Sequence, residues 1–200
     1  MGSTQLILAT RNPHKVEEFR RLFSSSIEIV SLDDIGFETE LPPEKESSHQ
    51  ENSFQKAEFV GRRLQKACLA DDSGFEVDAL GNQPGVLSAR FGGFKNSKKQ
   101  RELILQKLEG ETNRKAAFVC ILSLFDPATG GCLPFVGKVE GVVSDKDRGK
   151  GGFGYDAIFI PKGAEKSFGE MSAEEKDRYS HRAKAAILVE KFLLSQKEDL

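Results

Sequence analysis

The chain has 200 residues, of which 38% are hydrophobic and 30% are charged, and its formal net charge at pH 7 is -2. This length is sufficient for a buried core, and the charge argues against a general nucleic-acid or membrane-surface binder, which is usually basic. The three cysteines are widely spaced without a CxxC pair, so we expect no disulfide framework, no zinc site and a cytoplasmic location. No apolar run approaches about 18 residues, so we expect no membrane span.

Strand and helix patterns alternate through the first third of the chain, and a β-hairpin pattern follows in the middle. In order, we predict a strand at 5–9, a helix from Pro13 capped by Asn12, a strand at 27–32, a loop at 33–50, a helix at 51–67 and a short strand at 68–72. Residues 73–86 are turn-rich, and we expect a brief strand within them. We then predict a helix at 98–108, hairpin strands at 116–126 and 132–143, a strand at 155–161, a capping box at 172–175 and a helix at 180–194. This order indicates an α/β fold with a mixed sheet.

The segment TRNPHK, residues 10–15, lies where a strand ends and a helix begins. Helix N-termini present unpaired N–H groups and the positive end of the helix dipole, which suit a phosphate group. Lys15 would add a mobile positive charge. An ordinary capped helix with a surface lysine is the alternative, and this segment alone is compatible with both.

The segment LADDSG, residues 69–74, places two adjacent acids at the end of an apolar strand. Successive strand side chains point to opposite faces, so we expect Asp71 and Asp72 to have different tasks. A carboxylate in a cleft could hold Mg²⁺ or accept a proton from water, whereas an Asx-turn would need the acid only to close the strand.

Three acids, Glu44, Glu46 and Glu51, precede or open the predicted helix at 51–67. The helix dipole favours acids at this position, so their presence does not by itself require a ligand. Lys56 follows in the same helix, and such a residue is more often a solvated lysine than a ligand-binding one.

The segment GKGGFGYDAIF, residues 149–159, has four glycines among its first six residues but matches neither GxxxxGK[ST] nor GxGxxG. Phe153 is framed by glycines and could stack on a flat ring such as a nucleobase, with Asp156 bonded to a ring or sugar edge. A strained hairpin with Phe153 in the core is the alternative.

The segment KDRYSHR, residues 176–182, places His181 and Arg182 in the first turn of the terminal helix, where cations oppose the dipole. Donors here could read a carbonyl oxygen on a base, although a solvent-facing pair is also possible. Taken together, these segments supply cationic phosphate binders, metal-binding acids, a stacking aromatic ring and base-edge donors. This combination suits a nucleoside triphosphate with Mg²⁺.

The sequence resembles the inosine/xanthosine triphosphate pyrophosphatase family, which removes deaminated purine nucleotides. The matching segments occur in family order across nearly the whole chain: LATRNPHKVEEF, ENSFQKA, LADDSGFEVDALGNQPGVLSARF, AAFVCILSL, GGFGYDAIF and EEKDRYSHRAKA. ADDSG, PGVLSAR, GGFGYD and SHR are highly specific as a set. The chain departs from the family at Lys150, Ala157 and Glu46, where members commonly have other residues.

The resemblance implies a role for each matching residue. Asp72 resembles the catalytic proton acceptor and a metal ligand, and Glu44 resembles the second Mg²⁺ ligand, with Glu51 beside it. The implied substrate-binding residues are Thr10, Arg11, Asn12, Pro13, His14, Lys15 and Lys56 at the phosphates, Ser73 and Arg90 near the nucleotide, Phe153, Gly154, Tyr155 and Asp156 at the stacking wall, and Lys176, His181 and Arg182 at the base.

The resemblance also implies one nucleoside-triphosphate pyrophosphatase domain over residues 1–200, with a twisted mixed sheet flanked by helices, two lobes and a central nucleotide cleft. Members are usually homodimers without nucleic-acid or membrane partners. The expected reaction is Mg²⁺-dependent hydrolysis of ITP, dITP and XTP to the monophosphate and pyrophosphate. Two alternatives stay open: a pyrophosphatase for other modified nucleotides, and a non-catalytic nucleotide-binding module, for which the basic stretch KNSKKQR (95–101) is the best support.

Overall fold

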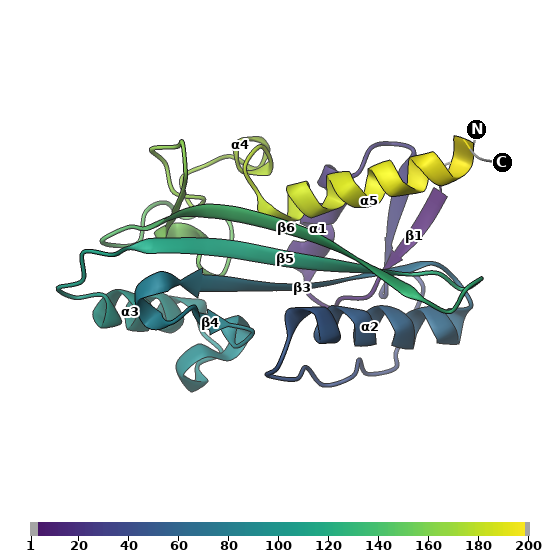
Figure 1. Cartoon of the computed structure of the whole chain (residues 1–200), viewed down its shortest axis with the longest axis horizontal. Coiled ribbons are helices and arrows are strands. Elements are labelled where there is room, and N and C mark those ends of the chain that lie inside the picture. Colours follow the sequence, from purple (N-terminus) through teal and green to yellow (C-terminus); the bar gives the residue numbers. More distant parts are fainter. Residues whose placement is uncertain (1–3, 199–200) are drawn as a thin grey trace. The chain divides into compact units, whose positions relative to one another are not determined.

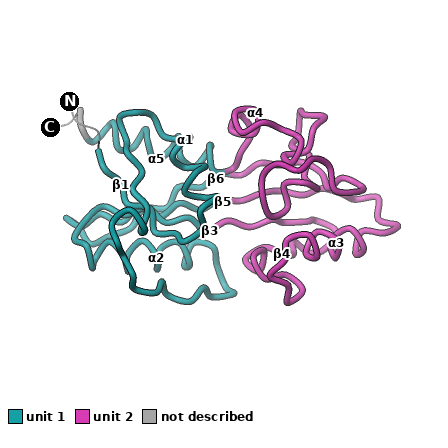
Figure 2. The backbone as a smooth tube through the Cα atoms, turned by 180° about the vertical axis from the view of Figure 1, so that it is seen from behind, with its two compact units in different colours: residues 1–72, 120–137, 182–200 teal, residues 73–119, 138–181 magenta. Residues whose placement is uncertain are grey.

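The computed structural model describes residues 4–198, and the chain divides into two compact units. Unit 1 comprises Met1–Asp72, Cys120–Gly137 and Arg182–Leu200, and unit 2 comprises Ser73–Val119 and Lys138–His181 (Figure 2). The chain therefore passes from one unit to the other four times. No helix in the described part of the chain is both long and apolar enough to cross a membrane.

A mixed sheet of seven strands forms the framework. Its strands are β1 (Thr4–Leu8), β2 (Ile27–Ser31), β3 (Cys68–Val77), β4 (Gln83–Gly85), β5 (Lys115–Phe125), β6 (Cys132–Val143) and β7 (Phe159–Pro161). The strand order is β2-β1-β3-β5-β6-β7, and β4 pairs with β3. β1 is parallel to both β2 and β3, whereas the β3–β4 and β6–β7 pairs are antiparallel. The predicted α/β fold with a mixed sheet is confirmed.

Five α-helices accompany the sheet in the described residues (Figure 1). They are α1 (Pro13–Leu22), α2 (His49–Leu64), α3 (Ser97–Lys107), α4 (Ala173–Asp177) and α5 (His181–Glu198). The predicted caps are confirmed for α1, where Asn12 Oδ1 accepts from the His14 amide at 3.0 Å, and for α4, where Ser172 and Glu175 form a capping box. These caps satisfy helix N–H groups that have no partner within the helix.

The core of unit 1 lies on both faces of the sheet. Leu6 and Leu8 of β1 pack in a cluster with residues of α1 and α5, whereas Ile7 and Ala9 pack in a cluster with residues of α2. This division follows from the two-residue period of a strand, which sends alternate side chains to opposite faces. Figure 1 shows α5 and α2 on opposite sides of the strands of this unit.

The core of unit 2 is aromatic. Phe75, Phe118, Phe159 and Phe168 are all buried, and Phe118 contacts the other three rings with centroid distances of 4.8, 5.0 and 6.0 Å. Aromatic pairs of this kind add to the free energy gained by burial alone. They hold β3, β5 and the segment around β7 together.

Several predicted boundaries were wrong. The strand at 68–72 continues to Val77, because β4 pairs with its second half. The helix predicted at 51–67 spans His49–Leu64, since Ser48 caps it and Gln65 adopts a left-handed conformation with φ of 51°. The strand predicted at 155–161 begins only at Phe159, because residues 156–158 form a 3₁₀ turn.

Candidate active site

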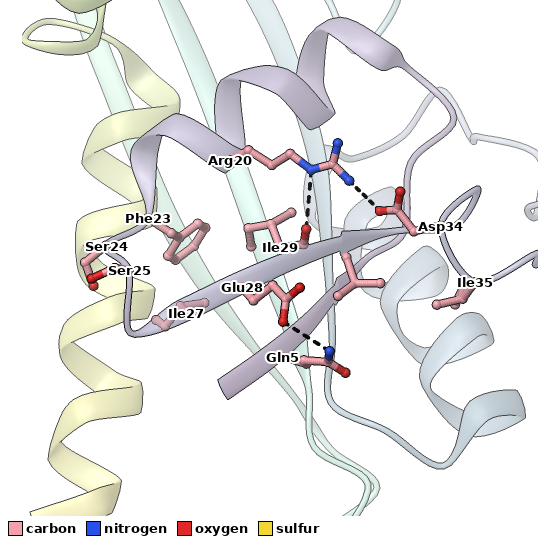
Figure 3. A pocket seen from close by; sticks show the side chains of 11 residues that line it. Gln5, Arg20, Phe23, Ser24, Ser25, Ile27, Glu28, Ile29, Asp34 and Ile35 are labelled. Carbon is pink, nitrogen blue, oxygen red and sulfur yellow. Dashed lines mark hydrogen bonds and ion pairs between the residues drawn. The ribbon is translucent and has the colours of Figure 1, made fainter. Parts of the chain in front are cut away.

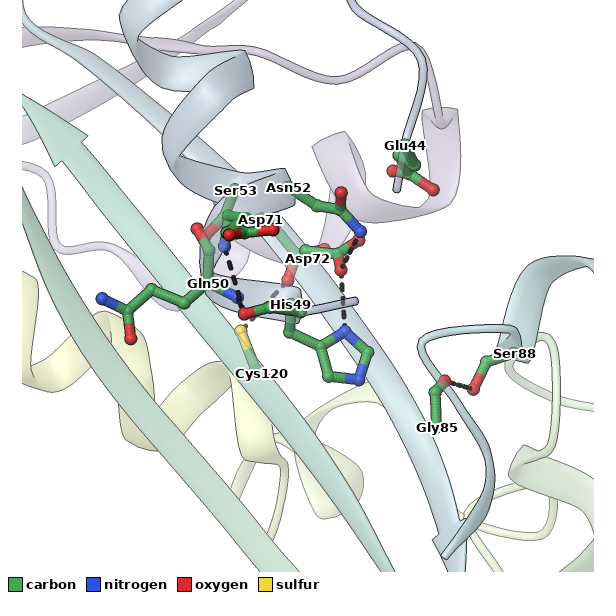
Figure 4. A network of polar contacts seen from close by, with 12 residues as sticks. Glu44, His49, Gln50, Asn52, Ser53, Asp71, Asp72, Gly85, Ser88 and Cys120 are labelled. Carbon is green, nitrogen blue, oxygen red and sulfur yellow. Dashed lines mark hydrogen bonds and ion pairs between the residues drawn. The ribbon is translucent and has the colours of Figure 1, made fainter. Parts of the chain in front are cut away.

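The two adjacent acids of β3 contact different sets of side chains, as the strand period predicted. Asp71 is fully buried, forms an ion pair with Lys15, and accepts a hydrogen bond from Cys120 Sγ at 3.1 Å. Asp72 Oδ2 lies 2.7 Å from His49 Nδ1 and 3.3 Å from Asn52 Nδ2 (Figure 4). Asp71 therefore contacts α1 and β5, whereas Asp72 contacts the start of α2.

Lys56 is buried between carboxylates, and the expectation of a solvated lysine was wrong. Its Nζ donates to Glu44 Oε1 at 2.7 Å and to the Asp71 carbonyl oxygen at 2.9 Å, and it lies 3.6 Å from Asp72 Oδ1. Burial alone would lower the pKa of Lys56, but the carboxylates of Asp72 and Glu44 outweigh it and the net shift is upward. The ammonium therefore stays protonated at neutral pH.

The phosphate-binding segment predicted at 10–15 joins β1 to α1. Thr10 Oγ1 accepts from the Asn12 amide at 3.2 Å, and Lys15 reaches Asp71 from the first turn of α1. The side chain of Arg11 turns to the following loop instead, where it binds Asp33 Oδ1 at 2.7 Å and the carbonyl oxygen of Phe37. Pro13 and His14 are exposed at the start of the helix.

The predicted base-reading pair is buried. Arg182 Nη1 donates to Glu18 Oε2 at 2.8 Å, with side-chain exposures of 5% and 4%, and Arg182 Nε lies 3.7 Å from Asp71 Oδ2. His181 stacks on Phe118 at a centroid distance of 4.7 Å and an interplanar angle of 8°. The alternative of a solvent-facing pair is thereby excluded.

In unit 2, Asp156 organises the glycine-rich loop. Its Oδ2 accepts from the Phe153 amide at 2.8 Å and from Lys176 Nζ at 2.8 Å, and the residue is buried. A side chain at Gly152, where φ is 67°, would approach within 2.1 Å of the same oxygen. The loop therefore needs glycine here. Lys176 Nζ also lies 5.1 Å from the centroid of the half-buried Phe153 ring.

Tyr155 is held within unit 2. Its hydroxyl donates to the Ser88 carbonyl oxygen at 2.8 Å, and its ring stacks on Phe75 with a centroid distance of 4.9 Å. Burial raises the pKa of Tyr155 above its usual value. The carbonyl oxygen of the neighbouring Gly154 accepts from Arg101 Nη1 at 2.8 Å. Tyr155 and Gly154 thus support the loop that carries Phe153.

Of the remaining predicted residues, Ser73 and Arg90 are half-buried and Glu51 is exposed. Ser73 follows Asp72 in β3 and belongs to unit 2, and Arg90 lies in a distorted 3₁₀ segment, Ser88–Gly93, with φ of -136°. Glu51 Oε2 accepts a hydrogen bond from Ser47 Oγ at 2.6 Å at the start of α2. This contact matches the ordinary role of an acid in the first turn of a helix.

Sequence reasoning missed His49 and Asn52 as partners of Asp72. A helix that starts at residue 49 places residues 49, 52, 53 and 56 on one face, because i, i+3, i+4 and i+7 lie on the same side. All four of these residues are polar and at most partly exposed. This polar stripe, combined with Ser48 as the cap, was a signal in the sequence.

The two carboxylates predicted as Mg²⁺ ligands fit that ion. Within residues 4–198, no group of three or more His, Cys, Asp or Glu side chains could hold a metal by itself. Mg²⁺ commonly takes only one or two carboxylates from a protein and fills its other positions with water and substrate phosphates. Glu44 and Asp72 already lie around one positive charge, the ammonium of Lys56.

A hollow of about 630 Å³ lies elsewhere in unit 1, beside the edge strand β2 (Figure 3). Gln5 Nε2 donates to Glu28 Oε2 there at 3.1 Å, and Arg20 pairs with Asp34. None of the predicted site residues lines this hollow. It is therefore separate from the acid-and-lysine cluster.

Comparisons with known proteins show which family this chain resembles. The model of the Ham1 family matches residues 6–192. The chain is 44% identical over 195 residues to a dITP/XTP pyrophosphatase of Porphyromonas gingivalis, covering 96% of this chain and 99% of the relative. It is 43% identical over 185 residues to a dITP/XTP pyrophosphatase of Thermus thermophilus, covering 90% and 87%.

Solved structures give the same result. The Ham1 protein of Staphylococcus aureus superposes with a TM-score of 0.85 at 34% identity, covering 96% of this chain and all of that one. A structure described as the nucleoside-triphosphatase or dITP/XTP pyrophosphatase of Mycobacterium abscessus superposes with a TM-score of 0.74 at 38% identity, covering 93% and 98%.

Proposed function

Because the chain belongs to the Ham1 family, we propose that it hydrolyses deaminated purine nucleoside triphosphates, such as dITP, XTP and ITP, to the monophosphate and pyrophosphate. The observation that carries this proposal is the cluster in unit 1. There, the acids Asp71 and Asp72 lie against the lysines Lys15 and Lys56, with Glu44 beside them. Such a cluster can bind phosphates and activate water.

Asp72 is the proposed catalytic base. Its carboxylate is mostly buried and fixed by hydrogen bonds, so it can accept a proton from a water that attacks the α-phosphorus. Lys15 and Lys56 stabilise the charge that develops on the phosphate oxygens, and pyrophosphate leaves. Mg²⁺ held by Glu44 and Asp72 would neutralise phosphate charge.

Thr10 and Asn12 are the proposed phosphate contacts at the start of α1. The N-terminal N–H groups of that helix and its dipole favour an anion there. For Arg11, the hydrogen bonds to the loop at 33–39 support a second task, which is to hold the segment before Glu44 in place.

The glycine-rich loop and the segment at 176–182 contribute the proposed base-binding residues. Phe153 would stack on the purine, and Lys176 is held beside its ring by Asp156. His181 and Arg182 are proposed to bond the carbonyl oxygen at the six-position of the purine, a group that adenine lacks. A site built to bond such a group rejects an analogue without it, by up to about 10⁴-fold or more.

The proposal is tested by incubating the protein with Mg²⁺ and ITP, dITP or XTP, with ATP and GTP in parallel, and separating pyrophosphate from orthophosphate. We expect pyrophosphate and the monophosphate from the deaminated nucleotides, and little turnover of ATP. Orthophosphate as the first product would move the attack to the γ-phosphorus and refute the mechanism. Turnover limited to modified pyrimidine nucleotides would refute the substrate class.

The base is tested by Asp72→Asn, which keeps the shape but cannot accept the proton. Loss of general-base catalysis typically costs about 10²- to 10⁴-fold in rate. Asp145→Asn is the matched control, because the Asp145 side chain is 94% exposed. Rates for Asp72→Asn similar to those of the control would exclude Asp72 as the base. We further propose that the protein is cytoplasmic and that it forms a homodimer. Sedimentation of the purified protein would test the homodimer.

A further inference from the structure

His49 contacts the proposed catalytic base directly. Its Nδ1 lies 2.7 Å from Asp72 Oδ2, and the two side chains are 10% and 8% exposed. His49 is the first residue of α2, and the cap at Ser48 fixes where that helix begins. The helix start therefore determines the position of the imidazole relative to the carboxylate (Figure 4).

Only one of the two polar atoms of the imidazole, Nδ1, contacts Asp72. An ionised carboxylate can only accept hydrogen bonds, so Nδ1 must carry the proton and donate it. The other ring nitrogen, Nε2, is buried and has no hydrogen-bond partner in the described part of the chain. Burying a polar ring nitrogen without a partner costs free energy, so the contact with Asp72 is the one that offsets the burial of this side chain.

Asn52 makes the second contact to the same oxygen. Its Nδ2 donates to Asp72 Oδ2 at 3.3 Å, while its own position is fixed by two hydrogen bonds to the backbone of Lys45, at 2.8 and 2.9 Å. Oδ2 is therefore occupied by two donors from α2. The other oxygen, Oδ1, faces Lys56 Nζ at 3.6 Å and is the one left to meet water.

We propose that His49 is a positioning residue for the pyrophosphatase reaction, which fixes the plane of the Asp72 carboxylate so that Oδ1 accepts the proton from water. This role rests on the proposed function of Asp72 as the base. Removing a residue that hydrogen-bonds to a metal-binding side chain and orients it typically lowers activity by about 10- to 100-fold, and Asp72 is also a proposed Mg²⁺ ligand.

Three substitutions of His49 distinguish the contribution of Nδ1 from that of Nε2. His49→Asn places an amide nitrogen near Nδ1, His49→Gln reaches toward Nε2, and His49→Phe keeps the ring shape without a donor. We expect kcat for ITP to fall about 10- to 100-fold in His49→Phe and His49→Gln, with KM and the affinity for the α,β-imido analogue of ITP unchanged. His49→Asn should recover most of the loss.

The control is Gln50→Phe, because residue 50 is the exposed next position of α2 and should leave kcat unchanged. Urea midpoints are measured for every variant, so that misfolding is separated from loss of positioning. Equal losses in all three His49 variants, together with a lower midpoint, would overturn the proposal in favour of a structural role. Wild-type kcat in a folded His49→Phe would overturn it as well.

The wild-type rate separates this proposal from the proposed function. Absence of pyrophosphate release by the unsubstituted protein from every purine triphosphate would refute the proposed function and, with it, the role of His49. Pyrophosphate release by the unsubstituted protein, combined with a His49→Phe rate equal to it, would refute only the role of His49.

Discussion

Replacing Lys56 by methionine removes a buried positive charge while keeping a side chain of similar length. In the native protein, this ammonium donates to Glu44 at 2.7 Å and to the Asp71 carbonyl oxygen at 2.9 Å. It also faces the buried Asp72 at 3.6 Å. In Lys56→Met the carboxylates would face each other without the intervening cation, and a buried carbonyl oxygen would lose its donor.

The expected loss of stability follows from these contacts. A hydrogen bond to a charged group contributes about 1.5 to 3 kcal/mol, and removing one partner of a buried pair costs about 3 to 5 kcal/mol. The Glu44 side chain is 33% exposed and can regain water, which reduces the loss. We therefore expect Lys56→Met to lower the free energy of unfolding by about 3 kcal/mol, which corresponds to about 6 to 12 °C in Tm for a chain of this size.

Urea unfolding followed by circular dichroism at pH 7 gives the change directly. Lys98→Met is the matched control, because the Lys98 side chain is 72% exposed and lies 3.9 Å from Glu102 on α3. We expect the control to change stability by less than about 0.5 kcal/mol. A loss of less than about 1 kcal/mol in Lys56→Met would refute the reasoning, because it would mean that the buried charges are compensated without the lysine.

Three further predictions follow from single side chains. The neutral Tyr155 hydroxyl stabilises the fold fully below about pH 10, and this contribution is lost as pH rises further toward the raised pKa of the folded state, so the wild type should lose more stability between pH 8 and 11 than Tyr155→Phe. This prediction would be contradicted if the urea midpoints of the two proteins fell by the same amount between pH 8 and 11. Burial raises the pKa of Cys132 to about 11, so its alkylation by iodoacetamide at pH 8 should be much slower in the folded than in the unfolded protein, and equal rates would refute the shift. Phe153→Ala should raise the Kd for the α,β-imido analogue of ITP about 10-fold with a small change in Tm, whereas a fall in Tm alone would show that this ring belongs to the core.

Local sequence signals were sufficient for much of the fold. The strand β6 begins and ends at the predicted residues, because a long β-prone run at 116–126 is followed by a turn and a second run. The caps at Asn12 and Ser172 were also predictable, since each depends on hydrogen bonds within two or three residues. Such features depend on residues that are close in sequence and can be predicted without knowing the tertiary contacts.

The candidate site was less predictable where it depends on distant partners. The local pattern favoured a solvated Lys56, because an exposed lysine is the common case, and only the family resemblance implied a role at the phosphates. Its contacts with Glu44 and the Asp71 carbonyl oxygen depend on how α2 packs against distant residues. The motif also gave no sign that Asp156 Oδ2 accepts from Lys176, which is 20 residues further along the chain. The motifs identified the candidate site residues, whereas their hydrogen-bond and ion-pair partners became known only from the structure.

The way in which unit 1 is assembled from the chain has a consequence for synthesis on the ribosome. Leu6, Leu8 and Phe19 come from the first 20 residues, yet their cluster also contains Ala185 and Val189 of α5. The elements β1, α1 and α5 all belong to unit 1 (Figure 2). Every residue of unit 2 precedes position 182. Chains emerge from the ribosome from the N-terminal end, so unit 2 can fold while the early strands of unit 1 still wait for their last helix. During that interval, the apolar side chains of β1 and α1 lack the α5 residues that pack against them in the folded protein.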